Sequence, residues 1–275
     1  MTDKVFAPSY STNSDGWYLF PPDAKMREQY FDHEAMEHPA KFNLHMMMAC
    51  VEYVSEPGEV LMDIFGGTGS LMLAANLGRY VTLLDIEDAY TKLQQKSKDK
   101  FVAADPALEH TITLVTGSNL KLMPIPCHHI ITSPPYAGIM KRKSKTGIGF
   151  SEADMAGDTK LWRALGDKLL QYSLSPDNIG NLNEFYYAQT MERVYKKSFA
   201  SILPGGTLTV VIKDHIRDGE RVYFSKWVWQ RCLAYGFEPM NWYKWKAPGS
   251  PFLQIKRAQG FETVGDEDIM IFRRP

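Results

Sequence analysis

The clearest chemistry in the chain is carried by residues 132–136, which read Thr-Ser-Pro-Pro-Tyr after the apolar pair Ile130 and Ile131. Two consecutive prolines remove two backbone donors and restrict the residue before them, so this segment can neither extend a strand nor enter a helix at once. We therefore expect a rigid exposed rim that presents a hydroxyl group, unpaired carbonyl oxygens and an aromatic ring. Such a rim suits a flat heterocycle with an exocyclic amine, although two prolines alone also indicate an ordinary stiffened loop.

A second motif lies upstream at residues 63–70, which read Asp-Ile-Phe-Gly-Gly-Thr-Gly-Ser. It follows a short apolar segment at residues 60–62 and precedes another at residues 71–77, which stops at Gly78. This pattern predicts a buried strand, a tight glycine turn and a helix that ends at Gly78. Glycines at the turn would let the backbone approach a ligand closely.

The same motif argues against two common nucleotide sites. A dinucleotide-binding turn needs a third glycine three residues after Gly69, where the chain has Met72, so a nucleotide-dependent oxidoreductase is disfavoured. No Gly-Lys-Ser or Gly-Lys-Thr step follows, which excludes the phosphate loop of nucleotide hydrolases. Asp63 at the end of the strand would repel a phosphate, but it can accept hydrogen bonds from a cationic or hydroxylated ligand.

In this order, the Asp-x-Phe-x-Gly-x-Gly turn and the Ser-Pro-Pro-Tyr rim resemble the S-adenosylmethionine-dependent amino-methyltransferases of the N4-cytosine and N6-adenine DNA family. The resemblance covers most of the chain, because further segments are similar to that family at residues 38–43 (HPAKFN), 203–211 (LPGGTLTVV) and 267–274 (EDIMIFRR). It implies S-adenosyl-L-methionine as the cofactor, DNA as the substrate and a cognate restriction endonuclease as a candidate partner. Each motif alone would be weak evidence, whereas the ordered pair is specific.

Strand and helix patterns alternate along the chain, which indicates an α/β fold with a doubly wound, mostly parallel sheet. Strands are expected at residues 60–63, 80–85, 111–116, 127–132 and 207–213, and helices at residues 43–54, 71–77, 183–202 and 223–235, with a charged helix that ends near residue 103. The resembled fold is a seven-stranded methyltransferase sheet with an antiparallel edge strand, and it pairs residues 238–246 with 268–273 at that edge. We expect one domain over residues 1–275, which begins with an irregular, aromatic-rich lead at residues 1–37.

Parallel strands end at a common edge, and open α/β sheets bind ligands there. The resemblance assigns the methionine part of the cofactor to Asp63 and the glycine turn, and the two ribose hydroxyl groups to Asp85, which alternatively caps the following helix. After the third strand, Ser118 or Asn119 takes the place of the acid that the family often uses for the adenine amine. The predicted cofactor-binding residues are Lys41, Phe42, Asp63, Phe65, Gly66, Gly67, Thr68, Gly69, Asp85, Ser118 and Asn119.

The predicted catalytic residues are Ser133, Pro134, Pro135 and Tyr136. A sulfonium methyl group is already activated, so the protein must orient the amine and make its nitrogen more nucleophilic. The side chain of Ser133 and the carbonyl group of Pro134 would accept the two amine protons, and Tyr136 would stack on the base. A base in duplex DNA must flip out to reach this rim.

The first residue of the rim bears on which base is modified. Serine in this position is typical of cytosine N4 methylation in the resembled family, whereas asparagine or aspartate is typical of adenine N6 methylation. We therefore favour a site-specific, cytosine-N4 DNA methyltransferase. The alternatives are an adenine N6 DNA methyltransferase, an RNA or protein-glutamine methyltransferase, and an adenosylmethionine-binding module without catalysis.

A cationic stretch follows the rim at residues 137–149, where Lys141, Arg142, Lys143 and Lys145 lie among glycines. It predicts a mobile DNA-binding flap that neutralises phosphates, or else a solvated flexible loop. Residues 138–182 are longer than an ordinary strand-to-helix connection of roughly 2–6 residues. We interpret them as an insertion that contacts DNA and recognises the target.

Composition fits a soluble enzyme. The 275-residue chain has a formal net charge of −1, so DNA binding would depend on local cationic patches. Its cysteines, Cys50, Cys127 and Cys232, show no Cys-x-x-Cys spacing, which predicts neither disulfides nor a metal site. No apolar stretch is long enough to cross a membrane and the start lacks the apolar centre of a signal peptide, so we expect a cytoplasmic protein.

Overall fold

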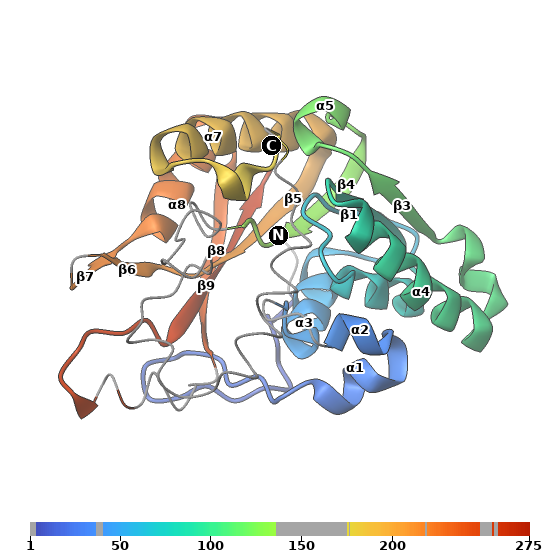
Figure 1. The fold of residues 1–275 in the computed structure, drawn as a ribbon, viewed down its shortest axis with the longest axis horizontal. Helices are drawn as coiled ribbons and strands as arrows, with labels where there is room; N and C mark the ends of the chain where they lie inside the picture. The colour runs from blue at the N-terminus through green and yellow to red at the C-terminus, as the bar shows by residue number, and fades with distance from the viewer. Residues whose placement is uncertain are drawn as a thin grey trace.

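The computed structural model describes residues 4–36, 41–135, 175, 177–217, 219–247, 255 and 258–275. In this part of the chain seven strands form one sheet, in the spatial order β3 (Ile112–Thr116), β2 (Tyr80–Asp85), β1 (Val60–Asp63), β4 (Cys127–Thr132), β5 (Ile202–Ile212), β9 (Asp266–Arg273) and β8 (Glu238–Lys246). The described helices are α1 (Ala24–Tyr30), α2 (His33–Met36), α3 (Leu44–Val54), η1 (Ser70–Leu77), α4 (Asp88–Ala104), η2 (Pro106–His110), α5 (Asn119–Leu122), η4 (Ile179–Asn181), α7 (Glu184–Ser201) and α8 (Phe224–Ala234). A separate hairpin joins β6 (His215–Arg217) to β7 (Glu220–Val222) (Figure 1).

The direction of the strands matches the fold class that the sequence predicts. Strands β3, β2, β1, β4 and β5 run parallel to one another. Strand β9 is antiparallel to both of its neighbours, β5 and the edge strand β8. The doubly wound, mostly parallel seven-stranded sheet with an antiparallel pair at its edge is therefore confirmed.

The sheet separates two hydrophobic cores, because consecutive residues of a strand face opposite sides. Leu61 of β1 packs into a core shared with α3, η1 and α4, whereas Met62 packs into a core shared with α7 and α8. Ile130 and Ile131 of β4 divide between the two cores in the same way. This burial on both faces explains why the central strands read as continuous apolar runs. Figure 1 shows α7 and α8 together on one side of the sheet and α3 and α4 on the other.

Local signals account for most helix boundaries. The side chain of Asn43 caps α3 by accepting a hydrogen bond from the Met46 N–H at 3.1 Å, and Asn183 caps α7 through the Tyr186 N–H at 3.0 Å. One expected helix differs in type, because residues 70–77 form a 3-10 helix, η1, rather than an α-helix. It ends at Gly78, whose φ of 75° is in the left-handed region that favours glycine.

The lead before α3 is more ordered than predicted. Residues 24–30 and 33–36 are helical, so the expectation of an irregular segment is wrong there. Earlier in the lead, Tyr18 forms backbone hydrogen bonds to Lys244 and Lys246 of the edge strand β8, and Phe6 stacks on Tyr243 with ring centroids 4.4 Å apart. The lead thus covers part of an edge strand whose backbone groups would otherwise be unpaired.

Strand β5 begins five residues before the predicted start, at Ile202 rather than at residue 207. The Leu-Pro-Gly-Gly segment, which precedes the predicted strand, is part of β5, and the register with β4 is irregular between Cys127 and His129. Gly205 has a φ of 84°, and Gly206 presses against the β4 backbone. The chain can bulge and still pair because these two positions are glycine.

Substituting these neighbouring glycines should have very different effects. A Cβ at Gly206 would lie 2.0 Å from the carbonyl oxygen of His128, so Gly206→Ala should lower the free energy of unfolding by about 3 kcal/mol or more. A Cβ at Gly205 would meet none of the described residues within 4 Å, so Gly205→Ala should lower the free energy of unfolding by only about 1 kcal/mol, for its left-handed backbone. Urea denaturation of both variants measures the difference. Equal losses would contradict the close approach at Gly206.

Strand β4 holds Cys127, His128 and His129. Burial raises the pKa of the Cys127 thiol to about 12, which is unsuited to a nucleophile. Among the described residues, the cysteines are free and buried, and no group of three or more His, Cys, Asp or Glu side chains is placed to hold a metal. None of the helices in that same part is long and apolar enough to pass through a bilayer.

Candidate active site

Four predicted positions lie at the carboxyl ends of parallel strands, namely the glycine turn, Asp85, Ser118 and Ser133. Asp63 ends β1 and Asp85 ends β2, the next strand of the sheet. Ser118 follows β3, and Ser133 follows β4, which pairs with β1 on its other side. The structure therefore brings the four predicted positions to one edge of the sheet, where open α/β folds bind ligands.

Asp63 links the glycine turn to the rim. Its Oδ1 atom accepts a hydrogen bond from the Phe65 N–H at 3.0 Å and another from the Thr132 hydroxyl group at 2.7 Å. Both Asp63 and Thr132 are buried. Because Thr132 directly precedes Ser133, one carboxylate fixes the first residue of the turn relative to the first residue of the rim.

Burial also determines the charge state of Asp63. It raises the pKa of this carboxyl group to about 7, against the opposing effect of the hydrogen bonds from Thr132 and Phe65, and the nearby charge of Asp85 raises the pKa further. A nearby cation would favour the ionised form. The group is thus suited to face a positively charged ligand.

Hydrogen bonds to β2 and α4 hold the glycine turn in place. The Gly66 N–H donates to the Leu84 carbonyl at 2.7 Å, and the Gln94 side chain donates to the Gly67 carbonyl at 2.8 Å. Gly67 and Gly69 have φ values of 47° and 84°. Within 4 Å and among the described residues, a Cβ at Gly67 would meet only the Phe65 carbonyl oxygen, at 3.7 Å, so the described structure leaves space for a ligand on that side of the turn.

Asp85 holds the turn from the second strand. Its Oδ2 atom accepts from the Gly67 N–H at 2.7 Å and its Oδ1 atom from the Glu87 N–H at 2.9 Å. Burial raises the pKa of Asp85 to about 6. An ionised carboxylate can accept about four hydrogen bonds, so Asp85 keeps acceptor capacity for a hydroxyl donor. The acids at this edge would repel phosphate.

The turn after β3 distinguishes the two residues predicted to contact an adenine amine. The Asn119 side chain donates to the Ile64 carbonyl at 2.9 Å and so supports the strand that carries Asp63. The hydroxyl group of Ser118 is buried and has no hydrogen-bond partner in the part of the chain that the structure describes. An unpaired buried hydroxyl group is unfavourable by about 1–3 kcal/mol, so this atom marks a place for a polar ligand group.

The rim is described up to Pro135. Ser133 and Pro135 are half-buried and Pro134 is buried. The Pro135 carbonyl accepts a hydrogen bond from the Tyr187 hydroxyl group at 2.6 Å. Other predicted residues lie outside the described residues, namely Tyr136 and the cations Lys141, Arg142, Lys143 and Lys145; the predicted insertion at residues 138–182 is described only at residues 175 and 177–182.

Lys41 and Phe42, predicted as cofactor residues, precede α3. The Phe42 carbonyl accepts hydrogen bonds from the guanidinium group of Arg27 and, at 3.5 Å, from the hydroxyl group of Ser70. Because Ser70 directly follows the glycine turn, these contacts bring Phe42 close to it. Arg27 is only 1% exposed, and its buried guanidinium is also paired with Asp23 at 2.9 Å.

Sequence reasoning missed several residues that hold the site, namely Arg27, Glu87, Gln94, Asn178 and Tyr187. Gln94 carried a usable signal, because it falls on the apolar face of α4 among core residues, where an amide needs an internal partner. Arg27 carried a weaker signal in its spacing of four residues from Asp23. Nothing in the sequence pointed to the other three.

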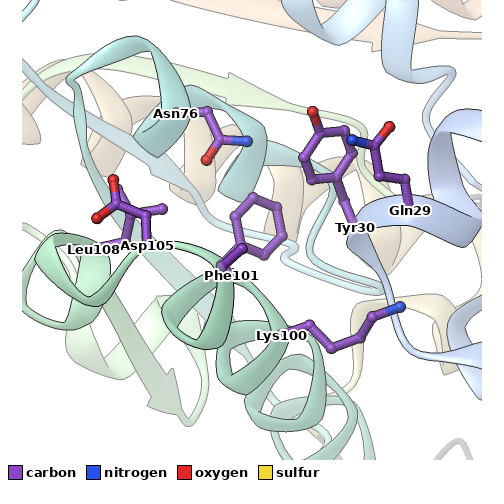
Figure 2. Close-up of a pocket in the computed structure, with 8 residues that line it drawn as sticks. Gln29, Tyr30, Asn76, Lys100, Phe101, Asp105 and Leu108 are labelled. Atoms are coloured by element: carbon purple, nitrogen blue, oxygen red, sulfur yellow. The ribbon is translucent and has the colours of Figure 1, made fainter.

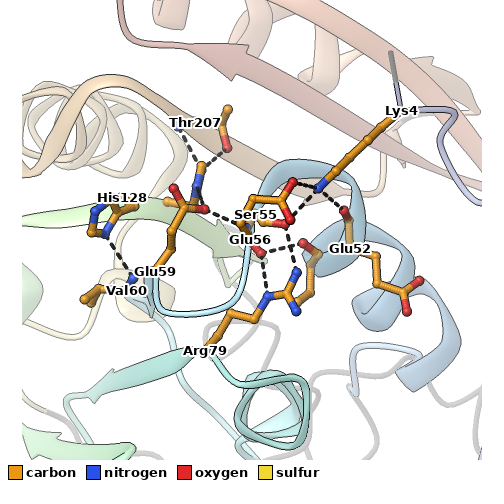
Figure 3. Close-up of polar contacts among 11 residues, drawn as sticks. Lys4, Glu52, Ser55, Glu56, Glu59, Val60, Arg79, His128 and Thr207 are labelled. Atoms are coloured by element: carbon orange, nitrogen blue, oxygen red, sulfur yellow. Dashed lines mark hydrogen bonds and ion pairs between the residues drawn. The ribbon is translucent and has the colours of Figure 1, made fainter. Parts of the chain in front are cut away.

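A pocket and a histidine cluster elsewhere in the molecule contain none of the predicted site residues. A pocket of about 130 Å³ lies between α1, η1, α4 and η2 and is lined by Gln29, Tyr30, Asn76, Lys100, Phe101, Ala104, Asp105 and Leu108 (Figure 2). At the amino end of β4, the His129 ring lies between Glu59 and Thr207, and His128 accepts from the Val60 N–H at 3.0 Å (Figure 3). Burial lowers the pKa of His129, which fits a structural, neutral ring.

Comparison with known proteins agrees with the predicted family resemblance. Residues 7–96 match the N6/N4 methyltransferase family model, described as DNA methylase. This segment contains the glycine turn and Asp85 and ends before the rim. The resemblance to the amino-methyltransferases of DNA is confirmed by this match. No curated protein matches the chain.

Solved structures show the same architecture at low sequence identity. The chain is 11% identical to a methyltransferase from Pyrococcus furiosus, with a TM-score of 0.50 over 92% of this chain and 93% of that one. It is 12% identical to the [4+2]-cyclase SpnF, with a TM-score of 0.51 over 90% and 86% of the two chains. TrmN from Thermus thermophilus matches at 13% identity and a TM-score of 0.49, over 86% of this chain but only 50% of TrmN. The first two likenesses show a Rossmann-like methyltransferase fold.

Proposed function

We propose that this chain, with its methyltransferase sheet and its DNA methylase segment, transfers a methyl group from S-adenosyl-L-methionine to the exocyclic amine of a DNA base, with cytosine N4 favoured over adenine N6. One observation carries the proposal. The Asp63 carboxylate accepts hydrogen bonds from both the glycine turn and Thr132, so the predicted donor site and the Ser133 rim are held side by side.

The residues at the strand ends fit the chemical groups of the cofactor. S-adenosyl-L-methionine would supply a methyl group that is activated on a sulfonium. Asp63 and the open side of Gly67 suit the cationic methionine part, and Phe42, whose carbonyl accepts from Ser70 after the turn, and Lys41 before it are proposed to contact the same part. Asp85 has acceptor capacity for a ribose hydroxyl group, and the unpaired hydroxyl group of Ser118 suits the adenine ring.

The rim would activate the amine by accepting hydrogen bonds from its two N–H groups. The Ser133 hydroxyl oxygen would accept one of these bonds and the Pro134 carbonyl oxygen the other. This favours a pyramidal nitrogen whose lone pair points toward the methyl group. The N–C bond forms as the methyl–sulfur bond breaks, and the amine then releases one proton to solvent. No covalent enzyme intermediate is needed. Tyr136 stacking on a flipped base, and the cations at residues 141–145 contacting phosphates, complete the proposal.

Mass spectrometry of nucleosides tests this function directly. The purified protein is incubated with isotopically labelled S-adenosyl-L-methionine and plasmid DNA, and with RNA and protein in parallel reactions. N4-methylcytosine in the DNA is the expected product, and N6-methyladenine would change the base but not the class. Label in RNA or protein alone would overturn the DNA assignment. Cofactor binding without any transfer would identify a binding module.

Ser118 provides a test of the cofactor site alone. We expect Ser118→Ala to weaken binding of S-adenosyl-L-methionine by about tenfold, because a hydrogen bond to the ligand is lost. Stability without ligand should not fall, since the hydroxyl group has no partner in the described structure. Isothermal titration calorimetry and urea denaturation measure the two quantities.

The control for this variant is Thr209→Val, which removes another buried hydroxyl group that lacks a partner within the described residues, in β5. It should leave cofactor affinity unchanged. A Ser118→Ala variant that loses stability but keeps its affinity would show that Ser118 does not face the ligand.

A further inference from the structure

A hydrogen bond from Tyr187 holds Pro135, the last residue of the rim that the structure describes. Pro135 has no N–H group, so its carbonyl is its only backbone polar group. This carbonyl accepts from the Tyr187 hydroxyl group at 2.6 Å. Since a carbonyl oxygen lies in the plane of its peptide bond, the contact restrains the orientation of the Pro135 carbonyl group.

Tyr187 is itself firmly placed. It lies in the first turns of α7, where its N–H donates to the carbonyl of the capping residue Asn183 at 2.8 Å. Its side chain is 2% exposed, and its ring lies 5.6 Å from that of Phe224 on α8. A donor on a packed helix can orient an acceptor without reorganising, which is what a preorganised site requires.

The segment before α7 adds a second support on the same side of the rim. The Asn178 side chain donates to the Glu87 carboxylate at 2.7 Å, and both side chains are buried. The Asn178 oxygen accepts from the Gly180 N–H at 3.0 Å, and a Cβ at Gly180 would lie 3.7 Å from the Pro135 side chain. The segment therefore packs on the rim while it is bonded to the loop after β2.

These contacts form a continuous path from the rim to the predicted ribose acid. The Glu87 N–H donates to Asp85, Asn178 donates to Glu87, and Gly180 packs against Pro135. The Asp63 to Thr132 bond holds the residue before Ser133, and Tyr187 holds Pro135, the last residue of the rim that the structure describes. The described part of the rim is thus held at two points relative to the cofactor side of the site.

We propose that Tyr187 is a positioning residue for methyl transfer. Its hydroxyl group holds the Pro135 peptide so that the Ser133 hydroxyl group and the Pro134 carbonyl point at the amine of the target base. Tyr187 does not touch substrate or cofactor in this role; it acts through the rim. This inference rests on the proposed function for its effect on rate, but the structural part of it can be measured without any reaction.

The Tyr187→Phe variant removes the hydroxyl group and leaves the ring in the core. Small errors in the placement of reacting groups reduce rates strongly, so we expect kcat to fall roughly 30-fold. The affinity for S-adenosyl-L-methionine, measured by calorimetry, should remain within about twofold, because the lost hydroxyl group contacts the rim, at the Pro135 carbonyl. Hydrogen exchange in the peptide that spans the rim should become faster than in the wild type.

Tyr195 supplies a matched control on the same helix. It is also a buried tyrosine, 1% exposed, but its hydroxyl group has no hydrogen-bond partner in the part of the chain that the structure describes. Tyr195→Phe should therefore keep the wild-type kcat, cofactor affinity and hydrogen exchange of the rim. The pair separates the effect of the Pro135 contact from the general effect of losing a buried hydroxyl group.

The outcomes are distinguishable. The inference is overturned if Tyr187→Phe exchanges at the rim like the wild type, or if Tyr195→Phe changes kcat and exchange as much as Tyr187→Phe does. If the wild-type protein methylates no DNA, the proposed function fails on its own. Exchange at the rim then still decides whether Tyr187 orders it.

Discussion

The Ser133→Ala variant is expected to transfer methyl groups roughly 100-fold more slowly than the wild type. The substitution removes one of the two acceptors that would hold the amine protons, so the nitrogen lone pair stays delocalised in the base. Cofactor affinity should remain within about twofold, because the Asp63 contacts use Thr132 and Phe65 and do not involve Ser133. Single-turnover kinetics with a DNA substrate and calorimetry with the cofactor measure these quantities.

A suitable control for Ser133→Ala is Ser198→Ala. Ser198 is a buried serine on α7 whose hydroxyl group bonds to the carbonyl of Val194 in its own helix, away from the rim. Its replacement should leave both rate and affinity unchanged. If Ser133→Ala lost cofactor affinity and rate to the same extent, the rim would be a structural support rather than the acceptor of the amine.

The Asp63→Asn variant is expected to be more stable than the wild type at pH 8 and to bind the cofactor more weakly. The pKa of Asp63 is raised by burial from an ordinary value of 3.8 to about 7 in the folded protein. The raised pKa therefore adds fully to the free energy of unfolding below about pH 4, and this contribution is lost as the pH rises to about 7. At pH 8 the asparagine avoids a buried charge, which corresponds to a gain on the order of 4 kcal/mol.

Both hydrogen bonds to Oδ1 can persist in Asp63→Asn, so any loss of binding reflects the missing negative charge. We expect the affinity of the wild type for S-adenosyl-L-methionine to rise with pH through about 7, and this rise to disappear in the variant. Asp99→Asn, which changes an exposed acid on α4, should alter neither property. A variant that is less stable at pH 8, or that keeps full affinity, would contradict this role of Asp63.

The strands that carry the site could be predicted because their signals are local. Residues 80–85 and 127–132 are short apolar runs that end at polar turns, and the structure has β2 and β4 at those positions. The glycine turn was visible for the same reason. Their common edge then followed from the rule that parallel strands end together.

The contacts that hold the site could not be predicted, since they join residues far apart in the chain. Tyr187 lies 52 positions from Pro135, and Asn178 lies 91 positions from Glu87. No local pattern marks a tyrosine hydroxyl group as the partner of a proline carbonyl. The type of η1 and the early start of β5 were missed because they depend on tertiary packing, which overrides local helix and turn preferences.

The hydrogen bond from Thr132 to Asp63 has a consequence for attempts to redesign base preference. A loop transplanted from another enzyme could begin at residue 133, and the hydrogen bond between Thr132 and Asp63 would then be retained. A transplant that began at residue 132 would replace Thr132, whose hydroxyl group bonds this loop to Asp63 at the end of β1. In such a redesign, residues from 133 onward can therefore be exchanged, whereas Thr132 and the strand before it should be kept.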